Sequence, residues 1–167
     1  FAFVATPAGA PLWGDFGDGV WIAASIVTLI AMVLFAGSLV GNPALPAPGA
    51  AQAARKPAHG VFKVTRHPMM WGFALWALAH LIAAPTPRTI VVTLAIGVLA
   101  LVGAHLQDRK KEALMGDAWQ QWEAKTSYWP RLHRLFSIGL LPWIGGIAIW
   151  LGATWLHSMA AGVWRWI

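Results

Sequence analysis

Residues 61–81 read VFKVTRHPMMWGFALWALAHL, and this stretch decides the architecture of the chain. A basic lead-in that ends at His67 meets Pro68, and residues 68–84 carry no formal charge. Proline suits the first position of a helix, because its missing N–H would have had no partner there. The stretch therefore predicts a membrane helix with Arg66 and His67 at its mouth and His80 deep inside it. An ionisable side chain inside a membrane span indicates function.

The composition supports an integral membrane protein. The chain has 167 residues, of which 58% are hydrophobic and only 11% are charged, whereas soluble domains carry about 25% charged residues. There is no cysteine, which excludes disulfides and thiolate ligands. The net charge of +6 comes from basic residues beside apolar runs, where topology and anionic lipid explain them. We therefore expect lipid as a partner and no nucleic acid.

The apolar runs predict an all-α polytopic bundle that forms one domain over residues 1–167. Runs of this kind have about the length that a bilayer core requires. In the last of them, Pro142 and the Gly145–Gly146 pair suggest a kink or close packing. The chain does not start with methionine, so we expect one or more upstream spans, with residues 1–5 as the tail of an earlier one. The predicted spans are residues 20–40, 68–84, 89–106 and 138–157.

Residues 108–125 have a different pattern, because charged residues alternate with apolar ones at helical spacing. This pattern predicts an amphipathic helix that lies at the membrane interface. The apolar positions are Leu114, Met115, Ala118, Trp119 and Trp122.

Positive charge predicts the orientation. Ten of the twelve Lys and Arg residues lie in two segments, residues 41–67 and 107–137, and the other side holds only Arg88 and Arg165. Basic loops stay on the cytoplasmic side. We therefore expect both segments to be cytoplasmic, with the protein in a bacterial inner membrane.

Arg66 and His67 form the first candidate site. Together with the free N–H groups behind Pro68, they suit an anion at a helix start. A phospholipid headgroup, a haem propionate or a cosubstrate carboxylate would each fit. The alternative is an interfacial pair that only extends towards water.

His80 forms the second candidate site. It lies thirteen residues after His67, about 20 Å along a helix axis, and it shares a stripe with Phe73, Trp76 and Ala77. An aromatic stripe that ends in imidazole could hold a flat macrocycle, but a histidine bonded to a neighbouring helix would look the same. His157 lies at a similar depth, so that a pair is geometrically allowed. Haem iron needs only one or two axial histidines, whereas no two histidines have the i,i+4 spacing typical of a zinc site.

Three segments resemble the NnrU family, which is related to the zeta-carotene isomerases. The first is GVFKVTRHPMMWGFALWALAHL at residues 60–81, with the pattern R-H-P-x-x-x-G followed by W-x-L-A-H. The second is DRKKEALMGDAWQQWEAKTSYWP at residues 108–130. The third is LPWIGGIAIWLGATWLH, which resembles the last span of the family and ends at His157.

The resemblance implies haem b and a redox-dependent cis–trans isomerisation of a polyene double bond. It places an axial iron ligand at His80, and it implies that one of two axial histidines leaves on reduction so that ferrous iron can meet the polyene. The family's second axial histidine lies in an upstream span, and His157 is the candidate within this chain. Trp71, Trp76 and Phe73 would shape an apolar channel for the substrate. The NnrU branch is linked to nitrogen-oxide metabolism and denitrification.

Two other functions stay open. Membrane methyltransferases that use S-adenosylmethionine on isoprenylcysteine or phospholipids also carry R-H-P-x-x-x-G, with a later pair of acids. Here that pair reads Lys111-Glu112, and the tyrosine usual after R-H-P is Met70. The third interpretation is a non-catalytic membrane subunit or assembly factor that works with other membrane subunits. In that case His80 is only structural.

Overall fold

The computed structural model describes residues 7–13 and 17–161, with side chains described as far as His157. In these ranges every regular element is a helix, which confirms the predicted all-α class. The predicted tail of an earlier span at residues 1–5 lies outside them. The elements are α2 (Asp18–Ser38), α3 (Ala50–Arg55), η1 (Gly60–Lys63), α4 (Pro68–Ala83), α5 (Pro87–Met115), α6 (Asp117–Lys125), η2 (Leu132–Ser137) and α7 (Leu140–Ala161).

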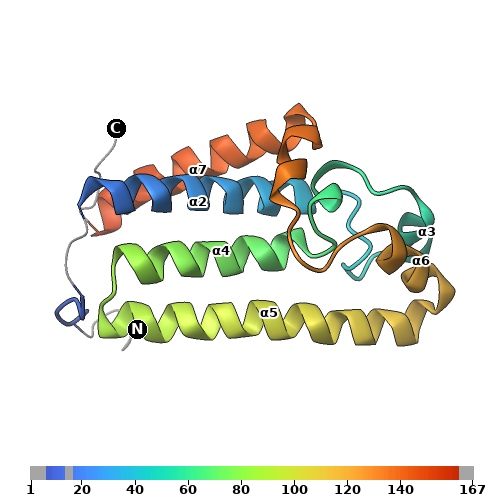
Figure 1. Ribbon diagram of the computed structural model, residues 1–167, viewed down its shortest axis with the longest axis horizontal. Coiled ribbons are helices and arrows are strands. Elements are labelled where there is room, and N and C mark those ends of the chain that lie inside the picture. The colour runs from blue at the N-terminus through green and yellow to red at the C-terminus, as the bar shows by residue number, and fades with distance from the viewer. Residues whose placement is uncertain (1–6, 14–16, 162–167) are drawn as a thin grey trace.

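Helices α2, α4, α5 and α7 form the long bundle, and neighbouring helices run in opposite directions (Figure 1). Helix α2 packs against both α4 and α7, and α4 packs against α5. One end of this bundle carries α3, α6 and the long connections, and we call that end the cap. The opposite end, where α4 and α7 finish, is called the histidine end here because His80 and His157 lie there.

Within the described residues, three helices are long and apolar enough to cross a membrane, namely α2, α5 and the part of α7 up to His157. Helix α4 is apolar but has only 16 residues, about 24 Å at 1.5 Å per residue. A bilayer core is about 30 Å thick. The second predicted span, residues 68–84, is therefore present as a helix that is shorter than the other three.

Helix α5 corrects the predicted boundary near residue 106. It continues without a break for 29 residues and ends at Gly116, which has a φ of 51° that favours glycine. The apolar composition stops near Gln107, but the charged residues that follow are good helix formers. The change from apolar to charged residues marks the point where the helix leaves the apolar layer and enters the cap.

The predicted interfacial helix is also corrected. Residues 108–115 belong to α5, and only Asp117–Lys125 form the separate helix α6. Trp119 and Trp122 are fully buried and pack with Phe62, Val61 and Leu34 in one hydrophobic core. The apolar face of α6 therefore packs against the protein rather than against lipid.

Close packing in the last span is confirmed. A Cβ on Gly146 would lie 2.5 Å from the Cα of Val33, so that α7 and α2 approach with no room for a side chain. A Cβ on Gly72 would likewise lie 2.9 Å from the Ala31 carbonyl oxygen, where α4 meets α2. Helices in membranes often use glycine for such approaches.

Candidate functional site

The predicted site residues fall into two groups at opposite ends of the bundle. Arg66 and His67 lie where α4 leaves the cap, and His80 and His157 lie at the histidine end. Helix α4 is continuous between the two groups. The Arg66–His67 pair is therefore separated from His80 along the helix axis, as predicted.

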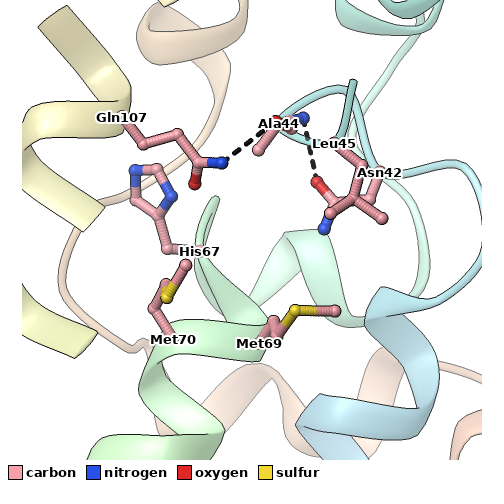
Figure 2. A pocket seen from close by; sticks show the side chains of 7 residues that line it. All are labelled: Asn42, Ala44, Leu45, His67, Met69, Met70 and Gln107. Carbon is pink, nitrogen blue, oxygen red and sulfur yellow. Dashed lines mark hydrogen bonds between the residues drawn. The ribbon is translucent and has the colours of Figure 1, made fainter. Parts of the chain in front are cut away.

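His67 precedes α4 and is only 2% exposed. It lines a small pocket together with the 42–45 turn, the two methionines that follow Pro68, and Gln107 of α5 (Figure 2). Its Nδ1 atom is buried and has no hydrogen-bond partner in the described structure. The other ring nitrogen, Nε2, lies 2.7 Å from Asp108 Oδ1.

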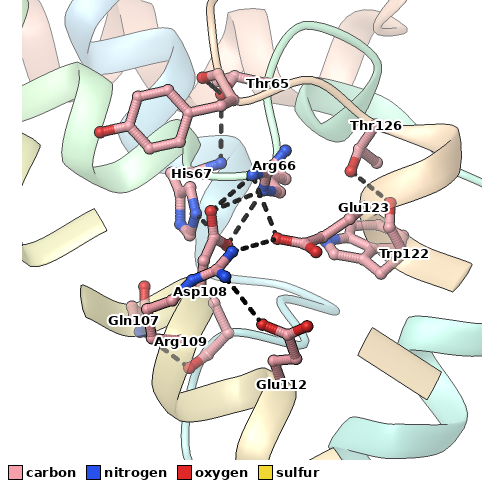
Figure 3. Close-up of polar contacts among 12 residues, drawn as sticks. Thr65, Arg66, His67, Gln107, Asp108, Arg109, Glu112, Trp122, Glu123 and Thr126 are labelled. Carbon is pink, nitrogen blue, oxygen red and sulfur yellow. Dashed lines mark hydrogen bonds and ion pairs between the residues drawn. The ribbon is translucent and has the colours of Figure 1, made fainter. Parts of the chain in front are cut away.

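Asp108 is the centre of an ion-pair network in the cap (Figure 3). Arg66 donates to both carboxylate oxygens of Asp108 through Nε at 3.0 Å, and its NH2 group donates to Oδ2 at 2.6 Å. The same NH2 group lies 3.3 Å from Glu123 of α6. Arg109 pairs with Glu112 at 3.1 Å and lies 3.8 Å from Glu123.

The predicted anion site at Arg66 and His67 is occupied by an anionic side chain of the protein itself. The anion that Arg66 and His67 bind in the structure is internal, the Asp108 carboxylate, which is 1% exposed. Because a carboxylate oxygen can only accept, the His67 Nε2 atom carries a proton. In a neutral ring Nδ1 then has a free lone pair. Binding of an external headgroup by Arg66 and His67 stays a prediction.

The segment after α6 closes over the start of α4. Thr65 Oγ1 donates to the carbonyl oxygens of Ser127 and Tyr128, and Trp71 Nε1 donates to the Tyr128 carbonyl at 2.8 Å. The Tyr128 hydroxyl donates to the Leu101 carbonyl of α5 at 2.8 Å. Burial, and secondarily the Asp108 charge, raise the pKa of Tyr128, so that its hydroxyl stays a neutral donor. These bonds tie α4, α5 and α6 into one unit.

The histidine end brings together His80, His157 and Trp76. The two imidazole rings have centroids 5.8 Å apart, although they come from α4 and α7. The ring of Trp76 stacks on His80 at 4.0 Å. Each histidine places Nδ1 against the carbonyl oxygen four residues earlier, Trp76 at 2.8 Å and Ala153 at 2.9 Å.

These two bonds fix the histidine tautomers. A carbonyl oxygen accepts only, so that both Nδ1 atoms carry the proton and both Nε2 atoms present a lone pair. Histidines that bind metals usually donate their other N–H to a carbonyl or carboxylate in this way. Among the histidine, cysteine, aspartate and glutamate side chains described, no group of three could hold a metal ion. The pair could therefore supply two ligands to a metal whose other ligands come from a cofactor.

Two predicted channel residues lie apart from this pair. The ring of Phe73 contacts Phe35 of α2 at 5.7 Å and is 39% exposed. Trp71 packs against Tyr128 and Trp129 in the cap. Sequence reasoning missed Asp108 and Gln107 as site residues. A signal for Asp108 existed, since it is the first charged residue after the apolar run from residue 89.

Comparison with known proteins identifies the family of the chain. The model of the family described as NnrU protein matches residues 1–165. The chloroplastic 15-cis-zeta-carotene isomerase of Zea mays is 32% identical over a match that covers 60% of this chain and 30% of the maize protein. The chain thus aligns with less than a third of that relative. No solved structure matches significantly. The match over nearly all residues, together with the predicted motifs, shows that the chain belongs to the NnrU family.

Proposed function

We propose that this protein is a membrane cis–trans isomerase of a carotenoid-like polyene that uses haem b held by His80 and His157. An isomerase-like role is supported by the NnrU family match and by the similarity to the maize isomerase. The observation that carries the haem proposal is the histidine pair, with ring centroids 5.8 Å apart.

The donor set fits the group. The ring centroids of His80 and His157 lie 5.8 Å apart, which is near enough for one nitrogen of each ring to bind the same metal ion through bonds of about 2 Å. Both Nε2 atoms are available, because both Nδ1 atoms bind backbone carbonyls. His157 is exposed, so that the pair opens at the edge of the bundle.

The protein's own residues have defined tasks in this proposal. His80 is held by its bond to the Trp76 carbonyl and by the stacked indole, so that it is the more firmly oriented ligand. His157 has only the Ala153 carbonyl and the ring of His80, and is the ligand that can leave. A bound haem would supply a one-electron couple whose ferrous state can donate into a polyene double bond and lower its barrier to rotation.

The test is the absorption spectrum of the protein purified with haem available. We expect a six-coordinate low-spin spectrum in the wild type and its loss in both His80→Ala and His157→Ala. Added imidazole should restore the low-spin bands in both variants. His105→Ala is the matched control, because this histidine is exposed on α5. An unchanged low-spin spectrum in His80→Ala would sink the assignment and leave His80 with a structural role.

The isomerase step needs a separate measurement. With haem loaded and a reductant present, the wild type should convert a cis polyene to the trans form, as read by chromatography. His80→Ala should not. Haem binding without conversion would favour the non-catalytic interpretation, in which this chain serves other membrane subunits in nitrogen-oxide metabolism.

The methyltransferase alternative gains no support from the cap. Arg66 is paired with Asp108 and Glu123, and Glu112 with Arg109. Calorimetry with S-adenosylmethionine should therefore show no binding. Micromolar binding that is lost in Arg66→Ala would reverse this ranking.

The orientation belongs to the same proposal. We place the cap, including residues 41–67 and 107–137, on the cytoplasmic side of a bacterial inner membrane, since ten of twelve Lys and Arg residues lie there. A reporter fused after Arg134 should read cytoplasmic, and one at Pro87 should read external. The opposite pattern would refute the orientation.

A further inference from the structure

The pocket beside His67 contains an unusual combination of groups. Its volume is about 10 Å³, and it is lined by Asn42, Ala44, Leu45, His67, Met69, Met70 and Gln107. The His67 side chain is fully buried, yet Nδ1 has no hydrogen-bond partner among the described residues. Figure 2 shows the imidazole at the edge of the pocket, with one ring nitrogen turned into the space and the sulfur atom of Met70 below the ring, whereas the Met69 side chain lies across the pocket on the side of Asn42.

The contact with Asp108 determines which ring nitrogen of His67 carries the proton. Nε2 donates to Asp108 at 2.7 Å, and Arg66 holds that carboxylate with three contacts. A carboxylate that accepts from one imidazole nitrogen fixes the orientation and the tautomer of the ring, as is usual behind metal-bound histidines. The lone pair of His67 Nδ1 therefore has a fixed direction and is available to a ligand in the pocket.

The rest of the lining offers this nitrogen few conventional partners. The Asn42 carboxamide oxygen accepts from the Ala44 N–H at 2.9 Å, and the Gln107 amide N–H donates to the Ala44 carbonyl at 3.0 Å. Both amides thus hold the pocket wall. The other side chains are alanine, leucine and two methionines, whose thioethers are soft, polarisable ligands.

Charge around the pocket favours a monovalent ion. Imidazole and thioether ligands are neutral, and the Asp108 charge behind His67 is shared with Arg66. The Lys111 ammonium donates to the Leu45 carbonyl at 3.2 Å, so that a second cation lies near the wall. A divalent ion would meet more repulsion there than a monovalent one.

We propose that this pocket is a binding site for a soft monovalent metal ion, copper(I), with His67 Nδ1 and the thioethers of Met69 and Met70 as ligands. Imidazole and thioether together select copper(I) among the biological metals. Methionine side chains have three rotatable bonds, which lets both sulfur atoms turn onto an ion. The site is independent of the histidine end, from which the length of α4 separates it.

The test is a competition titration of the full chain in detergent, under anaerobic conditions, with copper(I) supplied on a copper(I)-selective chelator. We expect one copper per protein, with nitrogen and sulfur neighbours in the X-ray absorption spectrum. The double variant Met69→Leu/Met70→Leu keeps the volume of the lining and should weaken binding by more than about 100-fold, beyond the loss typical of an outer-shell change. His67→Ala should do the same, although it also leaves Asp108 without one partner.

Matched controls separate this site from other sulfur and nitrogen donors. Met115→Leu changes a methionine elsewhere in the cap, and His59→Ala changes an exposed histidine; both should bind copper as the wild type does. His80→Ala and His157→Ala should also bind it, which distinguishes the site from haem binding. No copper uptake against the chelator, or uptake that survives Met69→Leu/Met70→Leu, would overturn the proposal. In that case the pocket holds at most a water molecule.

Discussion

The cap and the histidine end treat their polar side chains in opposite ways. In the cap, Arg66 pairs with Asp108 and Glu123, and His67 contacts Asp108, which is 1% exposed. At the histidine end, His80 and His157 face each other with their Nε2 lone pairs uncommitted. The cap thus uses its charged groups to hold helices together, whereas the histidine end keeps its donor atoms available for a ligand.

The packing of apolar side chains also differs between the cap and the rest of the bundle. The hydrophobic core of buried residues gathers around Trp119, Trp122 and Phe62 in the cap. Most of the exposed large apolar side chains lie along the bundle, as a surface that meets lipid requires. Stability should therefore depend most on the cap, and cofactor binding on the histidine end.

The largest effect is expected from Asp108→Asn. This change leaves the Arg66 guanidinium, on a side chain that is 13% exposed, without its main partner, and breaking a buried pair costs about 3–5 kcal/mol. The free energy of unfolding in detergent should fall by that amount, as measured by denaturant titration. The comparison between the two ends fails if the loss is no greater than that of His157→Ala.

Gly146→Ala should have the next largest effect. The new Cβ would lie 2.5 Å from the backbone of Val33, and overpacking of this kind costs about 1–3 kcal/mol. Gly152→Ala on the same helix is the control, because a Cβ there meets nothing within 4 Å. Thermal unfolding of both variants decides the matter, and equal melting temperatures would show that α7 can shift freely on α2.

Thr86→Ala should have a smaller effect at the histidine end. Thr86 Oγ1 accepts from the Thr89 N–H at 3.2 Å and caps α5, and loss of such a cap costs about 1 kcal/mol. Thr86→Ser retains the oxygen and should behave as the wild type. A loss in Thr86→Ser as large as in Thr86→Ala would indicate that the methyl group, and not the cap, stabilises this end.

The smallest effect on stability is expected from His157→Ala in haem-free protein. His157 is exposed, and such substitutions stay within about 0.5 kcal/mol. Denaturant titration with and without haem should show a difference between wild type and variant only when haem is present. A large loss without haem would assign His157 a structural role and weaken the proposed function.

Sequence reasoning predicted the helical class because apolar runs of membrane length allow few other structures. The predicted end of the third span at residue 106 was wrong. The sequence becomes polar at residues 106–108, but its helix propensity does not fall there, so the exit of the helix from the apolar layer was taken for the end of the helix. Sequence reasoning also misplaced the apolar face of α6. Trp119 and Trp122 recur at the same spacing whether they pack on lipid or on protein, and only the fold distinguishes the two cases.

The two candidate sites show the same limit. Depth along a helix follows from counting residues, and this placed His80 and His157 at similar heights. Azimuth depends on how the helices pack, so that the pairing of these rings could not be derived from the sequence. The partner of Arg66 and His67 was hidden for the same reason, because Asp108 is 42 positions away from Arg66 and reaches it only when α5 lies beside α4.

The uninterrupted length of α5 has a mechanical consequence. Its first turn is fixed by Thr86 beside the histidine end, and Asp108 is clamped by Arg66 and His67 in the cap. Each residue turns an α-helix by about 100°. The number of residues between these two points therefore sets the direction in which Asp108 points around the helix axis, relative to the fixed first turn. One residue inserted between them would swing the Asp108 carboxylate away from its partners, so that a change in the lipid-facing part of α5 would be felt first in the cap.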